Sequence, residues 1–395
     1  MTSFTPTLQK RAAMLAEIAS GAAHREGHGI DPREQVEMVR DSGLTALTLD
    51  PALGGPGGTI GDLVTFIIEL AEADPIVAHI LRSHYLQVRQ ISRLPDGPIR
   101  DRWAAELAAG KIFGNATSER DGALGTYQYA TKLVSSGSGW LLSGAKFYST
   151  GTAYADWVTV VAQLDEDQVV RVNLPLDRPG IEVLDDWDGI GQHRTGTGTT
   201  QFTDVWVTED DFLNVTSPKV ERIASDVPLM QLYLQAIMAG ILRTVVSDAS
   251  DLLRSRTRTF DHAPSQSPRR DPLLLETIGK LASTAYIAEA AVLSATSHID
   301  AAYASERTGN PDPELFARAS LAAAQVKVHV DEAGLSAASA IFNVGGASSA
   351  SRAKNLDRHW RNIRTLTLHN PTSYKAVAIG DHVVNGTALP ANGYF

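Results

Sequence analysis

The chain has 395 residues, more than one hydrophobic core usually supports, so we expect two or three domains. Its formal net charge of -10 argues against a nucleic-acid-binding protein, and the absence of cysteine excludes disulfides, thiolate nucleophiles and cysteine-ligated metals. No run approaches the ~18–20 uninterrupted apolar residues of a membrane span, and Glu17 and His24 interrupt any signal-like segment. We therefore expect a cytoplasmic protein that binds neither nucleic acid nor a membrane.

Residues 1–112 are predicted to form an N-terminal helical domain. Apolar residues recur there at helical spacing, and an N-cap followed by proline marks at least one helix start. The predicted helices are Pro6–Ala23, a helix from Asp31-Pro32 to Gly43, Gly61–Ala73 and Pro75–Leu94. A glycine-rich loop, Leu53 to Gly58, lacks the Lys-Ser/Thr pair of a phosphate-binding loop.

One histidine lies on the apolar face of the last of these helices. Val77, Leu81, His84 and Val88 share that face at helical spacing. His84 is therefore either a core histidine that a neighbour satisfies or a histidine that lines a pocket. The helix alone favours the first interpretation.

From residue 113 the hydrophobic pattern changes to a period of two, which predicts a central β-domain over residues 113–218. Thr131–Val134 and Trp140–Leu142 flank a Ser/Gly turn and so predict a β-hairpin. The other predicted strands are Asp156–Leu164, Gln168–Leu174, Gly180–Leu184 and Thr199–Val207. Short strands separated by turns favour an antiparallel β-barrel, with a sandwich as the alternative.

Residues 219–395 return to a helical pattern and predict a C-terminal four-helix bundle. The predicted helices are Val227–Arg258, Pro272–Ser305, Pro313–Asn343 and Lys354–Leu368. Their length indicates that they also pack between subunits. The whole chain is predicted to be of the α+β class and mainly helical.

The most distinctive stretch lies between Phe113 and Gly151, where small polar side chains gather. Asn115 to Glu119 forms one cluster, and Gly144 to Gly151 forms a second. Two short β-pieces with hydroxyl and amide groups suggest a cofactor platform. From the residues alone, Asn115 and Ser149 could instead bond to their own backbone, and His369 could cap its helix.

The order of helices, β-domain and helices resembles the acyl-CoA dehydrogenase fold over nearly the whole chain. The residues that carry the resemblance are Leu53 to Gly58, Asn115 to Glu119, Gly144 to Gly151, the arginines before Phe260 and the Gly345-Gly346 helix break. A dehydrogenase of this family needs a carboxylate base, often in the loop after the last Arg-rich helix. That loop here reads Leu368-His369-Asn370-Pro371. An acyl-CoA dehydrogenase with FAD and an atypically placed base therefore stays as the alternative.

Five segments are more similar to the flavin-dependent monooxygenases of the same fold, which include dibenzothiophene monooxygenase and the sulfur-acquisition oxidoreductases. They are Gly114 to Ala116, Tyr148 to Gly151, Asp185 to Gln192, Thr195 to Thr199 and Trp360 to His369. The resemblance implies a two-component monooxygenase that takes reduced FMN, or alternatively FAD, from a separate NAD(P)H-dependent flavin reductase. Through a C4a-(hydro)peroxyflavin it would oxygenate a small organosulfur, nitrogen or aromatic substrate. It also implies a homotetramer; a non-catalytic helical scaffold is the second alternative.

The resemblance assigns roles to individual residues. It implies that Asn115 and Ser149 hold the oxygenated flavin and that His369 or His84 supplies the proton. Thr117, Ser118, Phe147 and Tyr148 would flank the flavin ring. Arg258, with Arg256 as its competitor, would bind the flavin phosphate, since guanidinium binds phosphate through two hydrogen bonds. Gly346, Ala347 and Ser348 would reach the flavin of a neighbouring subunit, and no metal is implied.

Overall fold

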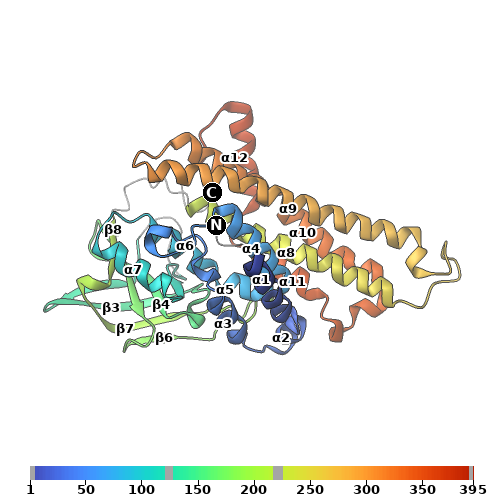
Figure 1. Ribbon diagram of the computed structural model, residues 1–395, viewed down its shortest axis with the longest axis horizontal. Coiled ribbons are helices and arrows are strands. Elements are labelled where there is room, and N and C mark those ends of the chain that lie inside the picture. Colours follow the sequence, from blue (N-terminus) through green and yellow to red (C-terminus); the bar gives the residue numbers. More distant parts are fainter. Residues whose placement is uncertain (1–4, 121–127, 217–225, 391–394) are drawn as a thin grey trace.

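The computed structural model describes residues 5–120, 128–216, 226–390 and 395. Three parts follow one another along the chain: N-terminal helices, a β-sheet and long C-terminal helices. In Figure 1 the sheet lies at the left-hand end, the long helices extend to the right, and the N-terminal helices lie between them. The predicted α+β, mainly helical class is confirmed. The second predicted domain boundary, between residues 218 and 219, lies outside the described residues.

The N-terminal part contains short helices that pack through apolar faces. Thr59 and Asp62 form a capping box at the start of α4, and the Asp74 side chain caps α5. The predicted single helix from Pro75 to Leu94 is in fact two helices, because Leu81, with a ψ of -3°, leaves the helical geometry and a new first turn begins at Arg82. The helices are α1 (Thr5–Ala19), α2 (Ala22–His28), α3 (Arg33–Asp41), α4 (Ile60–Ala73), α5 (Pro75–Ile80), α6 (Arg82–Ser92) and α7 (Pro98–Ala108).

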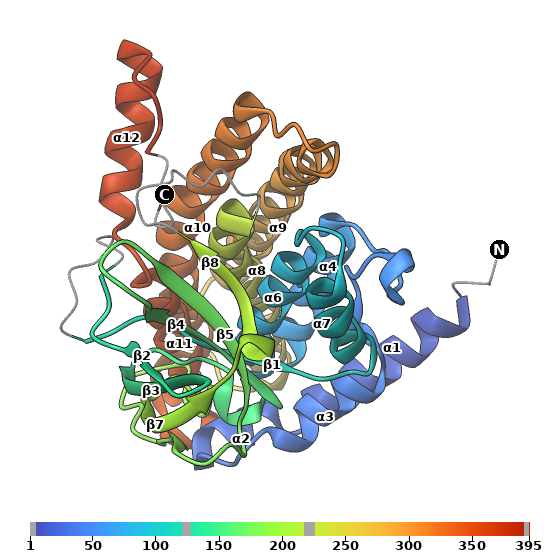
Figure 2. The same ribbon diagram turned by 90° about the vertical axis from the view of Figure 1, so that its left-hand side faces the viewer.

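The central part is an eight-stranded sheet in the order β6-β7-β3-β2-β4-β5-β8, with β1 paired to β4 (Figure 2). The strands are β1 (Phe113–Ala116), β2 (Lys132–Ser136), β3 (Gly139–Lys146), β4 (Trp157–Gln163), β5 (Val169–Pro175), β6 (Ile181–Val183), β7 (Thr200–Val207) and β8 (Phe212–Thr216). The predicted hairpin is confirmed as β2 and β3. Strand β8 was not predicted.

The sheet differs from the predicted antiparallel barrel in two respects. Strands β1 and β2 both run parallel to β4, and the strands at the ends of the path, β6 and β8, do not pair with each other. The connection from β1 to β4 contains the whole β2–β3 hairpin, which is long enough for the chain to re-enter in the same direction. The result is an open, mixed sheet.

The C-terminal part is built on three long helices, α8 (Asp226–Ser255), α9 (Pro272–Arg307) and α10 (Pro313–Gly345), with α11 (Asp357–Thr367) packed against α8 and α10. Helix α4 also packs on α8 and α9, so one hydrophobic core joins the N-terminal helices to the bundle. The sheet has a separate core. Sequence patterns missed α12 (Thr372–Asn385), which protrudes from the bundle in both views (Figures 1 and 2).

Helix α8 is long and apolar enough to cross a membrane by length and composition. However, 78% of its most apolar window is buried inside the protein. This burial is what a core helix of a bundle requires, and it explains the apolar composition without a membrane.

Candidate active site

The first turn of α6 brings together the separate segments that carry the predicted site. Arg82 Nη2 lies 3.2 Å from His369 Nε2, at the end of α11. Ser83 Oγ donates to the Thr150 carbonyl oxygen (3.2 Å), just after β3, and the His84 ring accepts the backbone N–H of Phe113 (3.2 Å) in β1. Three consecutive residues thus join His369, the Tyr148–Thr152 turn and the segment Phe113–Glu119, which we call the β1 platform.

The β1 platform orients an amide toward the site. Thr117 Oγ1 donates to Asn115 Oδ1 (2.7 Å), which fixes which end of the amide faces Thr117. The Asn115 backbone is held by Thr152 Oγ1, which accepts the N–H (3.0 Å) and donates to the carbonyl (3.1 Å). The side chain of Asn115 is half-buried, so its NH₂ end can still donate a hydrogen bond to a bound group.

A buried ion pair between Lys146 and Glu119 stabilises this platform. Lys146 Nζ lies 2.7 Å from Glu119 Oε1 and donates to the Thr117 carbonyl (3.1 Å). Burial lowers the pKa of Lys146 to about 8, and Glu119 partly counteracts the effect. Glu119 also accepts the N–H groups of Ala130 and Thr131. The pair therefore joins the end of β1 to β3 and to the start of β2.

The turn after β3 exposes an aromatic ring and buries a hydroxyl. Tyr148 is 53% exposed and has a φ of 58°, an uncommon backbone conformation for a non-glycine residue. Ser149 is fully buried, and its Oγ has no hydrogen-bond partner among the described residues. Gly151 has a φ of 84°, and a Cβ there would clash with the carbonyl oxygen of Ile80, so only glycine fits. An unsatisfied buried hydroxyl is costly, which points to a bound partner.

A threonine-rich loop lies directly against this turn. Thr150 Oγ1 and Thr195 Oγ1 both hydrogen-bond Thr197 Oγ1, at 2.8 and 2.6 Å. The carbonyl oxygens of Thr195 and Gly198 accept the N–H groups of Gly151 and Ser149. The loop that sequence analysis compared with the monooxygenases is therefore part of the wall that positions Ser149.

His369 lies beside a cation and is accessible to solvent. Its Nε2 accepts a hydrogen bond from the Arg82 guanidinium, so the neutral ring carries its proton on Nδ1. Desolvation by the surrounding protein, and then the positive charge of Arg82, lowers the pKa of His369 well below its ordinary value. His369 is thus a neutral hydrogen-bond donor at neutral pH. Its ring bonds Arg82 and does not act as the helix cap that was the alternative.

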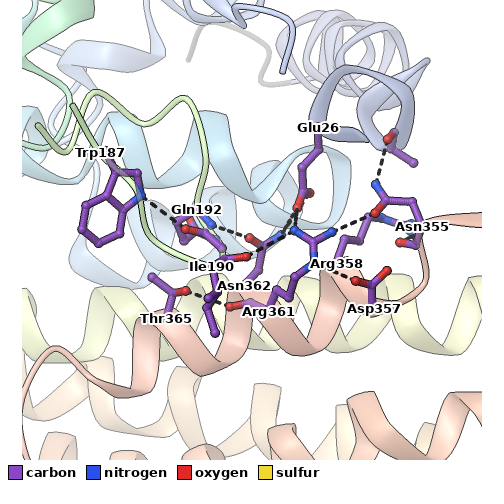
Figure 3. Close-up of polar contacts among 12 residues, drawn as sticks. Glu26, Trp187, Ile190, Gln192, Asn355, Asp357, Arg358, Arg361, Asn362 and Thr365 are labelled. Atoms are coloured by element: carbon purple, nitrogen blue, oxygen red, sulfur yellow. Dashed lines mark hydrogen bonds and ion pairs between the residues drawn. The ribbon is translucent and has the colours of Figure 1, made fainter. Parts of the chain in front are cut away.

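A second histidine, which sequence analysis did not select, belongs to the same group. His79 Nδ1 lies 2.9 Å from Gln192 Oε1, and the Gln192 N–H donates to Asn362 Oδ1 (2.7 Å). Burial, and then the charge of Arg82, lowers the pKa of His79 to about 3, so this ring is neutral as well. Asn362 Nδ2 donates in turn to both carboxylate oxygens of Glu26, at 3.2 and 3.0 Å (Figure 3).

This network fixes the loop between β6 and β7 against α11. Arg361 lies 3.6 Å from Glu26, and its Nη1 donates to the Ile190 carbonyl (3.3 Å) (Figure 3). A Cβ at Gly191 would clash with the Arg361 carbonyl oxygen. Burial raises the pKa of Glu26 to about 7, although Asn362 and Arg361 lower it.

His84 has the contacts of a structural histidine. It is 1% exposed, its Nδ1 accepts the Phe113 N–H, and its Nε2 is 3.0 Å from the Thr45 carbonyl oxygen, to which it donates. Both ring nitrogens are therefore used by the backbone, and burial lowers the pKa to about 4. The predicted catalytic role of His84 is at odds with these contacts. They match the other interpretation, a core histidine that its neighbours satisfy.

The predicted phosphate and glycine segments lie far from the platform within one chain. Arg258 follows α8, and Arg256 Nη1 donates to the Val344 carbonyl at the end of α10, next to Gly346. In Figure 1 the α8–α9 loop lies at the right-hand end, opposite the sheet. Arg258, Gly346, Ala347 and Ser348 are all exposed. They could reach a flavin on this platform only from another subunit.

The residues present fit a flavin. The unpartnered Ser149 hydroxyl and the Asn115 amide provide donors for the edge of a polar ring system. Exposed Tyr148 and half-buried Phe147, whose ring centroids are 4.4 Å apart, provide an aromatic surface at the same turn. Thr117 and Ser118 instead serve the platform: Ser118 accepts the Phe147 N–H through its carbonyl.

Sequence reasoning missed Arg82, His79, Gln192, Asn362 and Glu26. Arg82 and His79 stand in an apolar helical segment next to His84, and a polar side chain in such a segment is a usable signal. Glu26 and Asn362 carry no such signal, because only the packing of α2 against α11 buries them.

Comparison with known proteins agrees with this geometry. Residues 9–111, 114–205 and 232–374 match, in order, the N-terminal, middle and C-terminal domains of acyl-CoA dehydrogenase. Dibenzothiophene monooxygenase of Mycolicibacterium goodii is 28% identical over 91% of this chain and 89% of its own. A probable FMNH2-dependent monooxygenase, SfnC of Pseudomonas putida, is 28% identical over 96% of this chain and 95% of its own.

Solved structures give the same result. FMN-bound TdsC from Paenibacillus sp. A11-2 superposes with a TM-score of 0.90 at 25% identity, covering 99% of this chain and 100% of that one. The predicted resemblance to flavin-dependent monooxygenases is confirmed. The chain belongs to the acyl-CoA dehydrogenase family and is similar, over nearly its whole length, to the flavin-dependent monooxygenases of that family.

Proposed function

We propose that this protein is the oxygenase of a two-component monooxygenase that receives reduced FMN from a separate NAD(P)H-dependent flavin reductase. One observation carries the proposal: the loop after α11 presents His369 bonded to a cation, Arg82. Within the described part of the chain, no carboxylate bonds either residue. Proton abstraction next to a thioester needs a carboxylate base at the flavin, so this arrangement disfavours an acyl-CoA dehydrogenase. The names of the two relatives support the same reading.

When bound, reduced FMN would supply the two electrons that activate O₂, so that one oxygen atom is transferred to the substrate and the other leaves as water. The chain itself supplies position, dryness and hydrogen bonds. Ser149 Oγ and the Asn115 amide donate to the flavin edge, and neither side chain is easily oxidised. His369 donates through Nδ1–H, since Nε2 is occupied by Arg82. The threonine loop around Thr197 keeps water out behind Ser149.

The assembly we propose is a homotetramer. Helix α9 exposes Leu273, Tyr286 and Ile287, and protruding α12 exposes Tyr374, Val377, Val383 and Val384, which are 70–79% exposed. Apolar faces of this kind usually mark subunit interfaces. An interface along the bundle would also allow Arg258 and the Gly346–Ser348 segment to reach the flavin of a neighbour.

The substrate class we propose is a small organosulfur compound, because one relative is named for the sulfur compound dibenzothiophene. The test combines purified protein, FMN, a flavin reductase, NADH and oxygen with a panel of organosulfur, amine and aromatic compounds. Mass spectrometry should find a product that has gained one oxygen atom, with the atom derived from ¹⁸O₂. A His369→Ala variant that retains its fold should form far less of that product. If no compound gains oxygen and reduced FMN reoxidises at its free-solution rate, the proposal is wrong.

A further inference from the structure

Arg82 is a buried cation that has no anionic partner among the described residues. The side chain is 9% exposed, and burial lowers its pKa to about 10. Its Nε and Nη2 donate to the Met230 carbonyl oxygen, at 3.3 and 3.0 Å, and Nη2 also bonds neutral His369. Nη1 forms no hydrogen bond to any described residue. Every group that contacts this guanidinium is therefore neutral.

Four other arginines, all half-buried, each form an ion pair with a carboxylate: Arg25 with Asp74, Arg93 with Asp226, Arg178 with Asp211, and Arg358 with Asp248. Arg89 is even more buried than Arg82, but it lies over the Tyr303 ring and near the carboxylates of Glu306 and Asp300. An unpaired buried charge is strongly destabilising, so the lack of a carboxylate at Arg82 needs an explanation.

One carboxylate, that of Glu26, belongs to the polar network that includes His79. Glu26 is separated from His79 by Asn362 and Gln192, both of which bond through neutral groups. His79 is itself neutral. The described residues that bond Arg82 and His369 therefore bring no negative charge to this pair, and an anionic ligand could supply it.

We propose that Arg82 binds the anionic group of the substrate, and that the substrate is a small organosulfur acid that carries a carboxylate or sulfinate group. A guanidinium forms charge-assisted hydrogen bonds with such groups, and the two N–H bonds of Nη1 are available for this, since Nε and Nη2 already donate within the protein. The His369 ring faces Arg82 through Nε2, so its Nδ1–H is a further donor on the other side of the ring. The inference rests on the proposed function for the same site, and it separates this chain from enzymes that take uncharged polycyclic sulfur compounds.

Anion binding would also change the chemistry of His369. Arg82 is one of the charges that hold the pKa of His369 down. A bound anion would offset that charge and so shift the pKa of His369 upward, while desolvation by the surrounding protein and the charges of Lys327 and Lys375 would still hold it down.

The test measures anion binding to the flavin-free protein, so that it does not depend on monooxygenase activity. The probes are two matched pairs: methanesulfinate against uncharged dimethyl sulfoxide, and benzoate against benzamide. Calorimetry should show that the wild type binds at least one anion more tightly than its neutral counterpart. Arg82→Met should weaken that anion by roughly 10–100-fold, the value expected for loss of a charge-assisted pair. Arg82→Lys should retain part of the affinity, and Arg352→Met, at an exposed arginine, should retain all of it.

A second arm asks whether the anion belongs to the flavin. Binding of FMN and riboflavin, each oxidised and reduced, is compared in the wild type and in Arg82→Met. The proposal expects all four affinities to change by less than about threefold. A loss confined to FMN would assign Arg82 to the flavin phosphate, and a loss confined to the reduced forms would assign it to the reduced ring. Either result, or equal binding of charged and uncharged probes, overturns the proposal while leaving the monooxygenase assignment intact.

Discussion

Replacing Glu26 by glutamine should stabilise the protein at alkaline pH. The Glu26 side chain is 4% exposed, and burial raises its pKa from 4.5 to about 7 against the opposing effects of Asn362 and Arg361. The folded state therefore holds this proton more tightly than the unfolded state does. As the pH rises from about 4.5 to about 7, the wild type loses stability because the buried carboxyl must ionise. The pKa difference corresponds to at most about 3 kcal/mol above that window.

Glutamine cannot ionise, and its Oε1 can still accept a hydrogen bond from Asn362 Nδ2. The difference in free energy of unfolding between Glu26→Gln and the wild type should be near zero at about pH 5. It should grow to ~2–3 kcal/mol in favour of the variant at about pH 8. Buried His79 and His84 also make stability depend on pH, but they are unchanged in the variant and cancel in the difference.

Urea denaturation of both proteins at a series of pH values measures this difference directly. Glu34→Gln is the matched control, because Glu34 is an exposed glutamate in the first turn of neighbouring α3. It should give a small difference that does not vary across the pH window. Parallel stability curves for the wild type and Glu26→Gln would show that Glu26 is ionised at no cost, and the reasoning about its burial would be refuted.

Three further substitutions separate structural from functional residues. Ser149→Ala removes a buried hydroxyl that has no hydrogen-bond partner among the described residues. The free energy of unfolding should stay the same or rise by up to ~1 kcal/mol in chemical denaturation, while product formation falls roughly 10–100-fold. A clear loss of stability would contradict this. His84→Leu leaves the Phe113 N–H without an acceptor, so the free energy of unfolding should fall by ~1–3 kcal/mol. The folded variant should keep its kcat. A loss of kcat without a loss of stability would instead indicate a catalytic role for His84. Lys146→Met strands Glu119 and should cost ~3 kcal/mol. Adding Glu119→Gln should recover part of that loss of stability. If it recovers none, Lys146 and Glu119 are not energetically coupled.

Much of the fold was predictable because its signals are local. The switch from a helical to a two-residue period at Phe113, and the long apolar periodicity of α8, α9 and α10, appear in the sequence and in the structure at nearly the same residues. Local patterns failed where neighbours decide. Residues 75–94 read as one helix but form two, and β1 pairs in parallel with a strand that lies forty residues further on.

The sequence by itself determined the polar platform, since Asn115, Ser149 and His369 were all identified from short motifs and from a resemblance that those motifs carry. Only the tertiary structure decided what these groups face. It assigned His84 to the backbone and brought Arg82 to His369, across 287 positions of the chain. It also buried Glu26 against Asn362 without a signal in either segment. Charge and hydrogen-bond pairing depend on distances in space, and a linear pattern carries that information only where contacts are local.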